Sequence, residues 1–246
     1  MFHVIRSSDR YHIENEWLSS YWHFSFDHYY DPANVSFGPL RVFNEDVVAP
    51  GNGFPLHPHR EMEIVTYLID GEIEHKDTAG HHGIISAGEV QRMSAGTGIR
   101  HSEGNPSGKT PAHLLQLWLQ PAVTRLAPSW EQKRFPLADR AGKLLPIAAP
   151  ASNGTGNGKR PEHAVEIHQD ATIYTSLLAA GQMVTHTLGP KRRGYVFVMD
   201  GVLRVNGQTL ERGDQARISG ENSLEFAGPT VETAGASADF LFLDLP

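Results

Sequence analysis

Short segments with alternating hydrophobic and polar residues follow one another along most of the chain. Residues 63–69, EIVTYLI, are rich in β-branched and aromatic side chains and predict a strand. The Asp70-Gly71 dipeptide that follows them predicts a hairpin turn. In residues 113–121, HLLQLWLQP, leucine recurs at every second position, as expected for a strand with one buried face.

Further strands are predicted on either side of these segments. Residues 71–77, GEIEHKD, are expected to form the partner strand of the hairpin, with Ile73 and His75 on one face. The runs GIISAG and EVQRM predict two short strands separated at Gly88. Helical periodicity is weak, and one helical turn is expected in the stretch around residues 128–135, PSWEQKRF. Short strands with glycine-rich turns are typical of an all-β sandwich or barrel.

The second half of the chain repeats the pattern of the first. EIVTYLIDG, which ends at Gly71, matches GYVFVMDG, which ends at Gly201. EVQRMS after Gly88 matches DQARIS after Gly213, and LQLWLQP matches the C-terminal FLFLDLP. Three matches in the same order indicate an internal duplication, so we expect two similar β-barrels in tandem.

A change of composition separates the two halves. Residues 149–162, APASNGTGNGKRPE, are rich in Gly, Asn, Pro and Ser and predict a loop or linker. We therefore expect an N-terminal barrel over residues 1–134, a linker over 135–164, and a C-terminal barrel over 165–246.

Composition narrows the function. A formal net charge of −7 and a pI of about 6.0 argue against a nucleic-acid-binding protein, which would need a basic face. No signal peptide is visible at the N-terminus, and no run approaches the ~18 apolar residues of a membrane helix. We expect a cytoplasmic protein with no nucleic-acid or membrane partner. Because the chain has no cysteine, any metal must be held by His, Asp or Glu.

Two pairs of metal-ligating residues stand out among the 14 histidines and the acids. His57 and His59 flank a proline, and His101 and Glu103 are again one residue apart. Members of each pair share one face of a strand, because side chains alternate with period two. If the two strands are neighbours, three imidazoles and one carboxylate converge on one point. Such a set binds a divalent first-row metal and leaves coordination positions open, which suits catalysis.

Alternation alone does not identify the carboxylate ligand. Glu61 and Glu63 have the same parity as His57 and His59, so either carboxylate could face the imidazoles.

A second histidine pair and a set of large side chains also need an interpretation. The adjacent pair His81-His82 falls in a predicted turn and is expected at the surface. Four large residues are candidates either for the wall of a pocket that binds a planar ligand or for the core: Phe54, Met62, Met93 and Trp118.

Three motifs in this chain resemble the signatures of the pirin family, in particular its bacterial quercetinase-type members. They are HFSFDHYYDP, HPHREMEIVTYLIDGEIEHKD and MSAGTGIRHSEGNP, and the resemblance covers most of residues 10–121. Pirins are bicupins, with two cupin barrels of the double-stranded β-helix or jelly-roll type. The resemblance therefore implies the same tandem architecture as the internal duplication does.

The resemblance also implies a function. It assigns one metal to His57, His59, His101 and Glu103, whereas the pattern of ordinary cupins would use Glu63. We expect Fe(II), although Ni, Cu, Mn, Co or Zn also suit such a site. Quercetinase-type pirins open the central ring of a flavonol such as quercetin with O2 and release CO, and Glu103 is then the candidate base. The alternative is a non-enzymatic, metal- or redox-responsive regulator that binds a protein partner.

The second copy of the repeat lacks these ligands. Across the repeat, His57 and His59 correspond to Thr187 and Gly189, and the second pair corresponds to Phe226 and Gly228. We therefore expect a degenerate C-terminal barrel that binds no metal.

Overall fold

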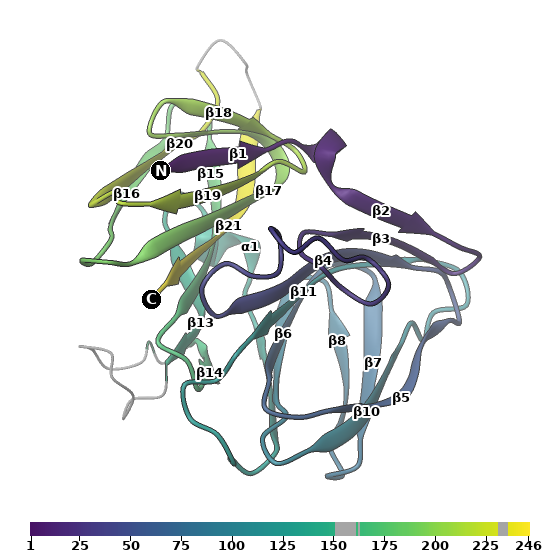
Figure 1. The fold of residues 1–246 in the computed structure, drawn as a ribbon. Helices are drawn as coiled ribbons and strands as arrows, with labels where there is room; N and C mark the ends of the chain where they lie inside the picture. Colours follow the sequence, from purple (N-terminus) through teal and green to yellow (C-terminus); the bar gives the residue numbers. More distant parts are fainter. Residues whose placement is uncertain (151–160, 162, 231–235) are drawn as a thin grey trace. The chain divides into compact units, whose positions relative to one another are not determined.

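The computed structural model describes residues 1–150, 161, 163–230 and 236–246. It consists almost entirely of β-strands, as Figure 1 shows, and this confirms the all-β prediction. The α-helix in the described part of the chain, α1 (Leu137–Arg140), has 4 residues and is far too short to cross a bilayer. A 3-10 turn covers Ser7–Asp9.

Contacts divide the chain into two compact units that are interleaved along the sequence. Tyr11–Phe135 together with Pro150–Asp170 form the unit called here the N-terminal barrel. The C-terminal barrel comprises Met1–Arg10, Pro136–Ala149 and Ala171–Pro246. The predicted ranges 1–134, 135–164 and 165–246 stay a prediction, and the centre of the predicted linker lies outside the described residues.

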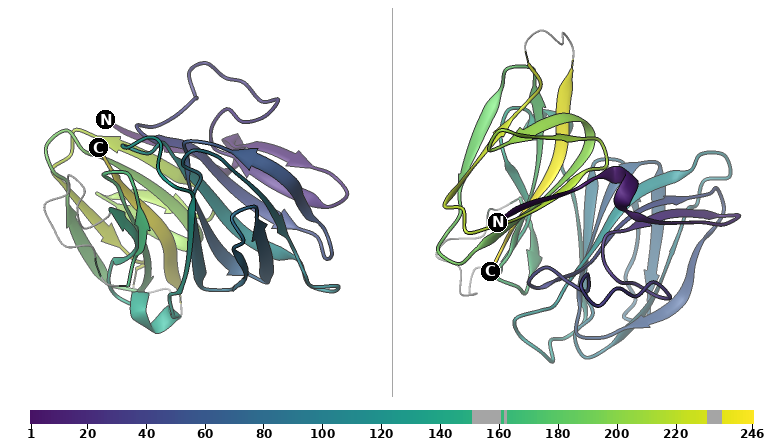
Figure 2. Two further views of the ribbon diagram at one scale, coloured as in Figure 1. Left: turned by 90° about the horizontal axis from the view of Figure 1, so that it is seen from below. Right: turned by 45° about the horizontal axis from the view of Figure 1, so that its top comes forward.

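Two antiparallel sheets form the N-terminal barrel, which Figure 2 shows in two further views. The larger sheet has the strand order β12-β9-β6-β11-β4-β3-β2, and the smaller has the order β5-β10-β7-β8. The two sheets enclose a core that contains Leu68 and Leu114 from the larger sheet and Ile73 and Ile85 from the smaller. The strands of this unit are β2 (Tyr11–Glu14), β3 (Leu18–Trp22), β4 (Leu40–Val48), β5 (Gly53–His59), β6 (Glu63–Asp70), β7 (Glu72–Asp77), β8 (His82–Ser86), β9 (Glu89–Ser94), β10 (Ile99–Gly104), β11 (Ala112–Leu119), β12 (Ser129–Arg134) and β14 (Val165–Ile167).

Asp70 and Gly71 do not form the predicted hairpin. β6 pairs with β9 and β11, whereas β7 pairs with β8 and β10, so the chain passes from one sheet to the other at Gly71. Gly71 has a φ of 77°, and a Cβ atom there would lie 2.5 Å from the carbonyl oxygen of Pro111. The hairpin prediction is therefore wrong, because this dipeptide marks a barrel corner that only glycine fits.

The helical turn expected around residues 128–135 lies just after them, in α1, and not within them. Ser129–Arg134 form β12, which pairs with β9 so that Trp130 lies opposite Met93. The indole N–H of Trp130 donates to Gln91 Oε1 at 2.8 Å, and Gln132 donates to Glu89 at 2.8 Å. Alternate side chains are thus held by the neighbouring strand, a long-range pairing that overrides weak local propensity.

The C-terminal barrel repeats this arrangement. One run of strands has the order β1-β19-β17-β21-β15-β13, and β17 also pairs with β18 and β20. The core is rich in aromatic residues, including Phe226, Phe240 and Phe242. The strands of this unit are β1 (Phe2–Ile5), β13 (Leu145–Pro150), β15 (Thr172–Ala179), β16 (Met183–Thr187), β17 (Arg193–Val205), β18 (Gln208–Glu211), β19 (Gln215–Ser219), β20 (Ser223–Ala227) and β21 (Ser237–Leu245).

Corresponding positions confirm the internal duplication. β16 pairs with β20 as β5 pairs with β10. Gly201, the counterpart of Gly71, has the same φ of 77°, and a Cβ atom there would lie 1.8 Å from the carbonyl oxygen of Ser237. The same corner, with the same requirement for glycine, therefore occurs in both barrels.

Candidate metal centre

Strand β10 brings the candidate ligands together, because it lies between β5 and β7 in the smaller sheet. His101 lies opposite His57 of β5 and opposite Asp77 of β7. Glu103 lies opposite His75 of β7. Directly opposite residues of antiparallel strands point to the same side of the sheet. The pairing that the sequence analysis required between the two histidine-bearing segments is thus present.

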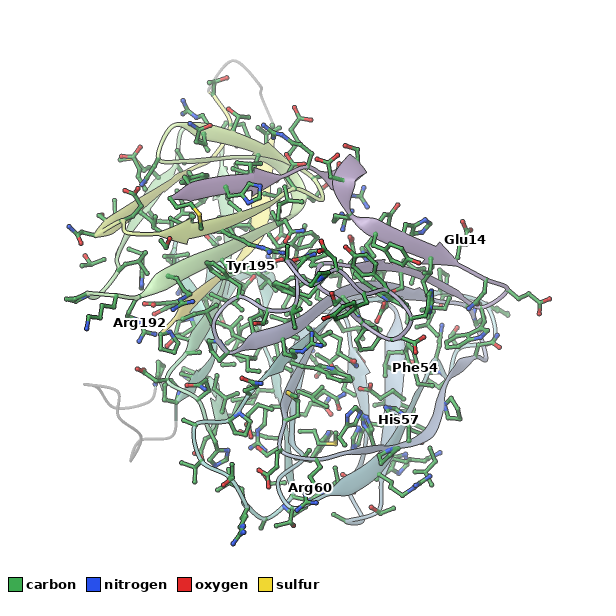
Figure 3. The ribbon with its side chains drawn as sticks, viewed as in Figure 1. Glu14, Phe54, His57, Arg60, Arg192 and Tyr195 are labelled. Atoms are coloured by element: carbon green, nitrogen blue, oxygen red, sulfur yellow. The ribbon has the colours of Figure 1, made fainter. Side chains whose placement is uncertain are left out.

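The rings of His57, His59 and His101 form a compact triangle. Their ring centres are 4.7, 4.5 and 4.8 Å apart, and their candidate ligand atoms all lie within 4.8 Å of one another. Two imidazoles bound to one cation at right angles would have ring centres roughly 4.5 Å apart, since metal–nitrogen bonds are about 2.1 Å long. The triangle therefore has the dimensions of a facial three-nitrogen site. Figure 3 shows His57 and Phe54 along β5.

The hydrogen bonds of these rings leave nitrogen lone pairs free. His57 Nδ1 lies 2.7 Å from the carbonyl oxygen of Pro55, which can only accept, so Nδ1 carries the proton and Nε2 the lone pair. His59 Nε2 and His101 Nε2 are buried and have no hydrogen-bond partner among the described residues. Buried nitrogens without a partner are costly, and a bound cation would satisfy them. These residues therefore fit a metal.

Two of the imidazoles are neutral at physiological pH. Burial, reinforced by repulsion from the neighbouring imidazoles, lowers the pKa of His59 to about 3. Burial and repulsion from His57 and His75 also lower the pKa of His101 to about 3. Because protonation competes with metal binding, a low pKa keeps these nitrogens available as ligands.

Glu103 is buried and held by two glutamine side chains. Its Oε2 accepts from Gln116 Nε2 at 2.7 Å, and its Oε1 accepts from Gln91 Nε2. Each glutamine is oriented by an indole N–H, which can only donate: Trp118 donates to Gln116 Oε1 at 3.0 Å, and Trp130 donates to Gln91 Oε1 at 2.8 Å. The tryptophans thus take up the amide oxygens and turn both NH2 groups toward the carboxylate of Glu103.

Glu63, the alternative carboxylate ligand, accepts hydrogen bonds from a different set of residues. Ser94 Oγ donates to Glu63 Oε2 at 2.9 Å, and the backbone N–H of His168 donates to the same oxygen at 3.2 Å. Its hydrogen bond to the His168 ring raises the pKa of that histidine. Glu103, in contrast, lies with His75 and His101 in a second group whose candidate ligand atoms are within 4.8 Å of one another. The geometry thus favours Glu103 over Glu63, and the four-ligand set stays a prediction.

His75 belongs to this cluster, although the sequence analysis assigned it no role. Its side chain is fully buried, and its Nδ1 lies 3.4 Å from Nδ1 of His101. His75 Nε2 lies 3.1 Å from Asp77 Oδ2, and Asp77 also binds His81 Nδ1 at 2.8 Å. The sequence signal was the shared face of Ile73 and His75, but strand alternation cannot show that His101 lies on the adjacent strand.

An aromatic cavity of about 620 Å³ opens beside the cluster. His57 and Glu103 contribute to its wall, so the candidate metal centre is accessible from it. The other aromatic members of the wall are Trp17, Trp22, Phe26, His28, Phe54 and Trp118. Of the residues that the sequence offered for such a pocket, Phe54 and Trp118 line it, whereas Met93 is buried in an apolar cluster against which Met62 packs.

Polar groups from β3 and β4 form a second part of the cavity wall. Ser20 Oγ donates to Asp46 Oδ1, and burial raises the pKa of Asp46 to about 7. Asn44 is buried, and its Oδ1 has no hydrogen-bond partner among the described residues. The cavity therefore offers hydrogen-bonding groups as well as aromatic faces.

The corresponding part of the C-terminal barrel has different chemistry. His186, next to Thr187 on β16, has its Nε2 2.8 Å from Asp244 Oδ2, and Arg192 donates to Asp244 Oδ1. Among the described residues of this barrel, no three metal-ligating side chains lie within 4.8 Å of one another. His186, Arg192 and Asp244 thus form a salt-bridged cluster next to Thr187, the position that corresponds to His57.

Comparison with known proteins gives a consistent result. The Pirin family profile matches residues 4–119, and the profile of the quercetinase C-terminal cupin domain matches residues 157–245. The chain is 44% identical over 208 residues to a pirin-like protein of Caulobacter vibrioides, covering 85% of this chain and 86% of that one. It is 36% identical over 246 residues to quercetin 2,3-dioxygenase of Escherichia coli K12, covering 100% and 99%.

Solved structures agree in fold. YhhW from Escherichia coli superimposes with a TM-score of 0.90 at 34% identity, covering 100% of this chain and 98% of that one. The same bacterial pirin in complex with nickel(II) gives a TM-score of 0.89 at 34% identity, with coverage of 100% and 99%. Sequence and structure therefore agree that this chain is a bicupin and belongs to the pirin family.

Proposed function

We propose that His57, His59, His101 and Glu103 hold one divalent transition metal and that the chain is a flavonol dioxygenase. The reaction opens the central ring of a flavonol such as quercetin with O2 and releases CO. The observation that carries the proposal is a triangle of imidazoles with free lone pairs at the wall of an aromatic cavity. Relatives named quercetin 2,3-dioxygenase support the choice of substrate class.

When bound, the metal would act as a Lewis acid that lowers the pKa of a coordinated substrate hydroxyl and favours its electron-rich anion. We expect Fe(II), and a relative crystallised with nickel(II) supports a first-row metal in general. Imidazoles bind a metal through an unprotonated nitrogen and carry no charge as ligands, so a divalent metal with Glu103 as its single anionic ligand would keep a net positive charge. A positive centre favours the anionic form of the substrate.

Glu103 is the proposed proton acceptor. Its two oxygens each accept one hydrogen bond from a glutamine, so the carboxylate is held in a fixed orientation and retains lone pairs for a proton. It lines the same cavity as His57, and its carboxylate lies within 4.8 Å of a ring nitrogen of His101, so a hydroxyl bound at the histidine triangle would be near this carboxylate. General-base catalysis of this kind contributes typically 10²- to 10⁴-fold, as an order-of-magnitude estimate.

The cavity fits a planar polyphenol. Trp17, Trp22 and Phe54 offer aromatic faces for stacking and displace water from the reacting ring. Asn44 Oδ1 is buried, has no hydrogen-bond partner in the described part of the chain and can accept from a phenolic hydroxyl. Asp46 lies two residues further along the same strand. A volume of about 620 Å³ is within the range of small-molecule sites.

The test is turnover of quercetin by metal-loaded protein under air. We expect loss of the visible absorbance of quercetin together with release of CO, and neither under argon. His57→Ala should abolish both, whereas His186→Ala, in the other barrel, should leave both unchanged. If metal-loaded protein leaves quercetin intact, the enzymatic proposal is wrong and the regulator hypothesis becomes the better one.

A further inference from the structure

A buried chain of hydrogen-bonding groups leads from the histidine triangle into β7. Asp77 Oδ2 lies 3.1 Å from His75 Nε2, and His75 Nδ1 lies 3.4 Å from His101 Nδ1. The side chains of Asp77 and His75 are fully buried, so no solvent competes for these contacts. His101 Nε2, at the far side of the ring, is buried and has no hydrogen-bond partner among the described residues.

Hydrogen-bond chemistry fixes where each proton lies along this chain. A carboxylate only accepts, so His75 must carry a proton on Nε2 to bond to Asp77. In a neutral ring, Nδ1 of His75 is then an acceptor, and His101 must donate from its own Nδ1. His101 is thereby left with an unprotonated Nε2.

We propose that Asp77 and His75 position His101 for metal binding by fixing its imidazole in the Nδ1-protonated tautomer, with the lone pair on Nε2. This inference rests on the proposed metal site, because the lone pair matters only if a cation is bound there. Metal-ligating histidines generally donate their other N–H to a carboxylate or carbonyl, which orients the ring. Here an additional histidine would transmit the effect of the carboxylate.

Asp77 is well placed for this role. Burial alone would raise its pKa, but hydrogen bonds from His75 and His81 more than compensate and leave the pKa below its usual value. Its Oδ1 accepts the backbone N–H groups of Ala79 and His81, both at 2.9 Å. The carboxylate is therefore fixed in orientation by the turn that follows β7.

The same turn makes Asp77→Asn a decisive variant. The two backbone N–H groups require an oxygen at the Oδ1 position, so the new amide must place its NH2 group where Oδ2 now faces His75. His75 would then accept through Nε2 and donate from Nδ1, and His101 would have to accept through its Nδ1. The proton of His101 would move to Nε2 and block the metal-binding lone pair.

His75→Phe provides the comparison. The ring of His75 stacks on Trp130, with ring centres 5.6 Å apart and planes at 22°, and a phenyl ring can keep that contact. This variant removes the acceptor next to His101 but imposes no tautomer, so the lone pair on Nε2 stays available part of the time. Replacing the more remote Asp77 should therefore weaken metal binding more than replacing His75 itself, the reverse of what a merely structural role predicts.

The experiment reads tautomers in metal-free, ¹⁵N-labelled full-length protein by long-range ¹H–¹⁵N correlation of the imidazoles. Zn²⁺ affinity is measured separately by competition with a chelator. In the native chain, His101 should be protonated on Nδ1. Asp77→Asn should move the proton to Nε2 and weaken Zn²⁺ binding about 10- to 100-fold. His75→Phe should weaken binding less. His82→Gln alters a hydrogen bond to Glu74 between β8 and β7, and it should change neither the tautomer of His101 nor the Zn²⁺ affinity.

Three results would overturn the proposal: a native His101 protonated on Nε2, an Asp77→Asn chain with native tautomer and Zn²⁺ affinity, or Zn²⁺ bound directly through His75. Melting temperatures of all variants separate these outcomes from misfolding. The tautomer is measured in metal-free protein, so the two proposals can fail separately. If the native chain has His101 protonated on Nδ1 but binds no Zn²⁺, the proposed function is refuted, whereas the fixing of the His101 tautomer is not.

Discussion

Trp130 Nε1 lies 2.8 Å from Gln91 Oε1, and this bond determines which end of Gln91 faces Glu103. Because an indole N–H can only donate, the amide oxygen of Gln91 must point toward it, and the NH2 group points toward Glu103. Trp130 therefore orients the carboxylate of Glu103 indirectly, through the side chain of Gln91. The same arrangement recurs on its other side through Trp118 and Gln116.

Trp130→Phe tests this orientation without changing the cavity, whose wall does not include Trp130. The phenyl ring can still stack on His75, as Trp130 does. It has no N–H group to donate to Gln91, so the side-chain amide of Gln91 becomes free to rotate. Losing one such hydrogen bond costs about 1 kcal/mol, so flavonol turnover should fall about 3- to 10-fold while metal content stays near native. Turnover and metal analysis of the same preparation check this. Unchanged turnover would mean that Gln91 does not orient Glu103.

The carboxylate assignment is tested by comparing Glu103→Gln with Glu63→Gln. Glu103→Gln removes charge and basicity at the centre, so we expect weaker metal binding and turnover lowered by ~10²-fold or more. Glu63→Gln should keep the metal, because Glu63 bonds to Ser94 and His168 instead. It should lower the free energy of unfolding by about 1–3 kcal/mol, as expected when a buried hydrogen-bond partner is altered.

Metal content and urea unfolding of both variants distinguish the two assignments. If Glu63→Gln loses the metal and Glu103→Gln behaves like the native chain, the site follows the ordinary cupin pattern, and the carry-over from pirins is wrong at this position.

We expect about one metal per chain, held in the N-terminal barrel. His57→Ala and His101→Ala each remove one ligand and should abolish metal retention, whereas both barrels keep their apolar cores and should stay folded. Elemental analysis gives the stoichiometry, and circular dichroism reports the fold. Global unfolding of either variant would show that the metal is structural, and two equivalents of metal would disprove the assignment to one barrel.

Local patterns were enough to predict strands such as β6 and β11, the duplication, and the two pairs of candidate ligands, His57 with His59 and His101 with Glu103. Each of these depends on period-two alternation or on the position of glycine, and both are properties of a short segment of the chain. They could not predict that β6 and β7 belong to different sheets, because Asp70-Gly71 looks the same at a hairpin and at a barrel corner. The strand β12 was missed for a related reason, since it depends on pairing with β9.

The candidate site shows the same limit. His75 had a visible signal, because it shares a strand face with Ile73, but its importance depends on His101 lying on the adjacent strand. His81 was expected at the surface, and its side chain is indeed 34% exposed, yet its ring binds the buried Asp77. Groups that act through a ligand rather than on the metal follow no fixed spacing in the sequence.

Asp46 should make the stability of the metal-free protein depend on pH. Burial raises its pKa from 3.8 to about 7 in the folded state, so between these values the folded chain holds a proton that the unfolded chain has released. Stability should therefore fall as pH rises through this window, by at most about 1.4 kcal/mol per pH unit, and the contribution should level off above pH 7.

Asp46→Asn removes this titration while keeping the size of the side chain and an oxygen that can accept from Ser20. Relative to the native chain, the variant should gain about 2 kcal/mol in free energy of unfolding between pH 5 and pH 7. Urea unfolding of both chains after metal removal checks this, because bound metal would add its own pH dependence. Asp27→Asn is the matched control, since Asp27 also lines the cavity but its side chain is 72% exposed. Parallel profiles for the native chain and Asp46→Asn would mean that Asp46 is ionised in the folded state across this range, and the cavity would then present a carboxylate rather than a carboxylic acid to its ligand.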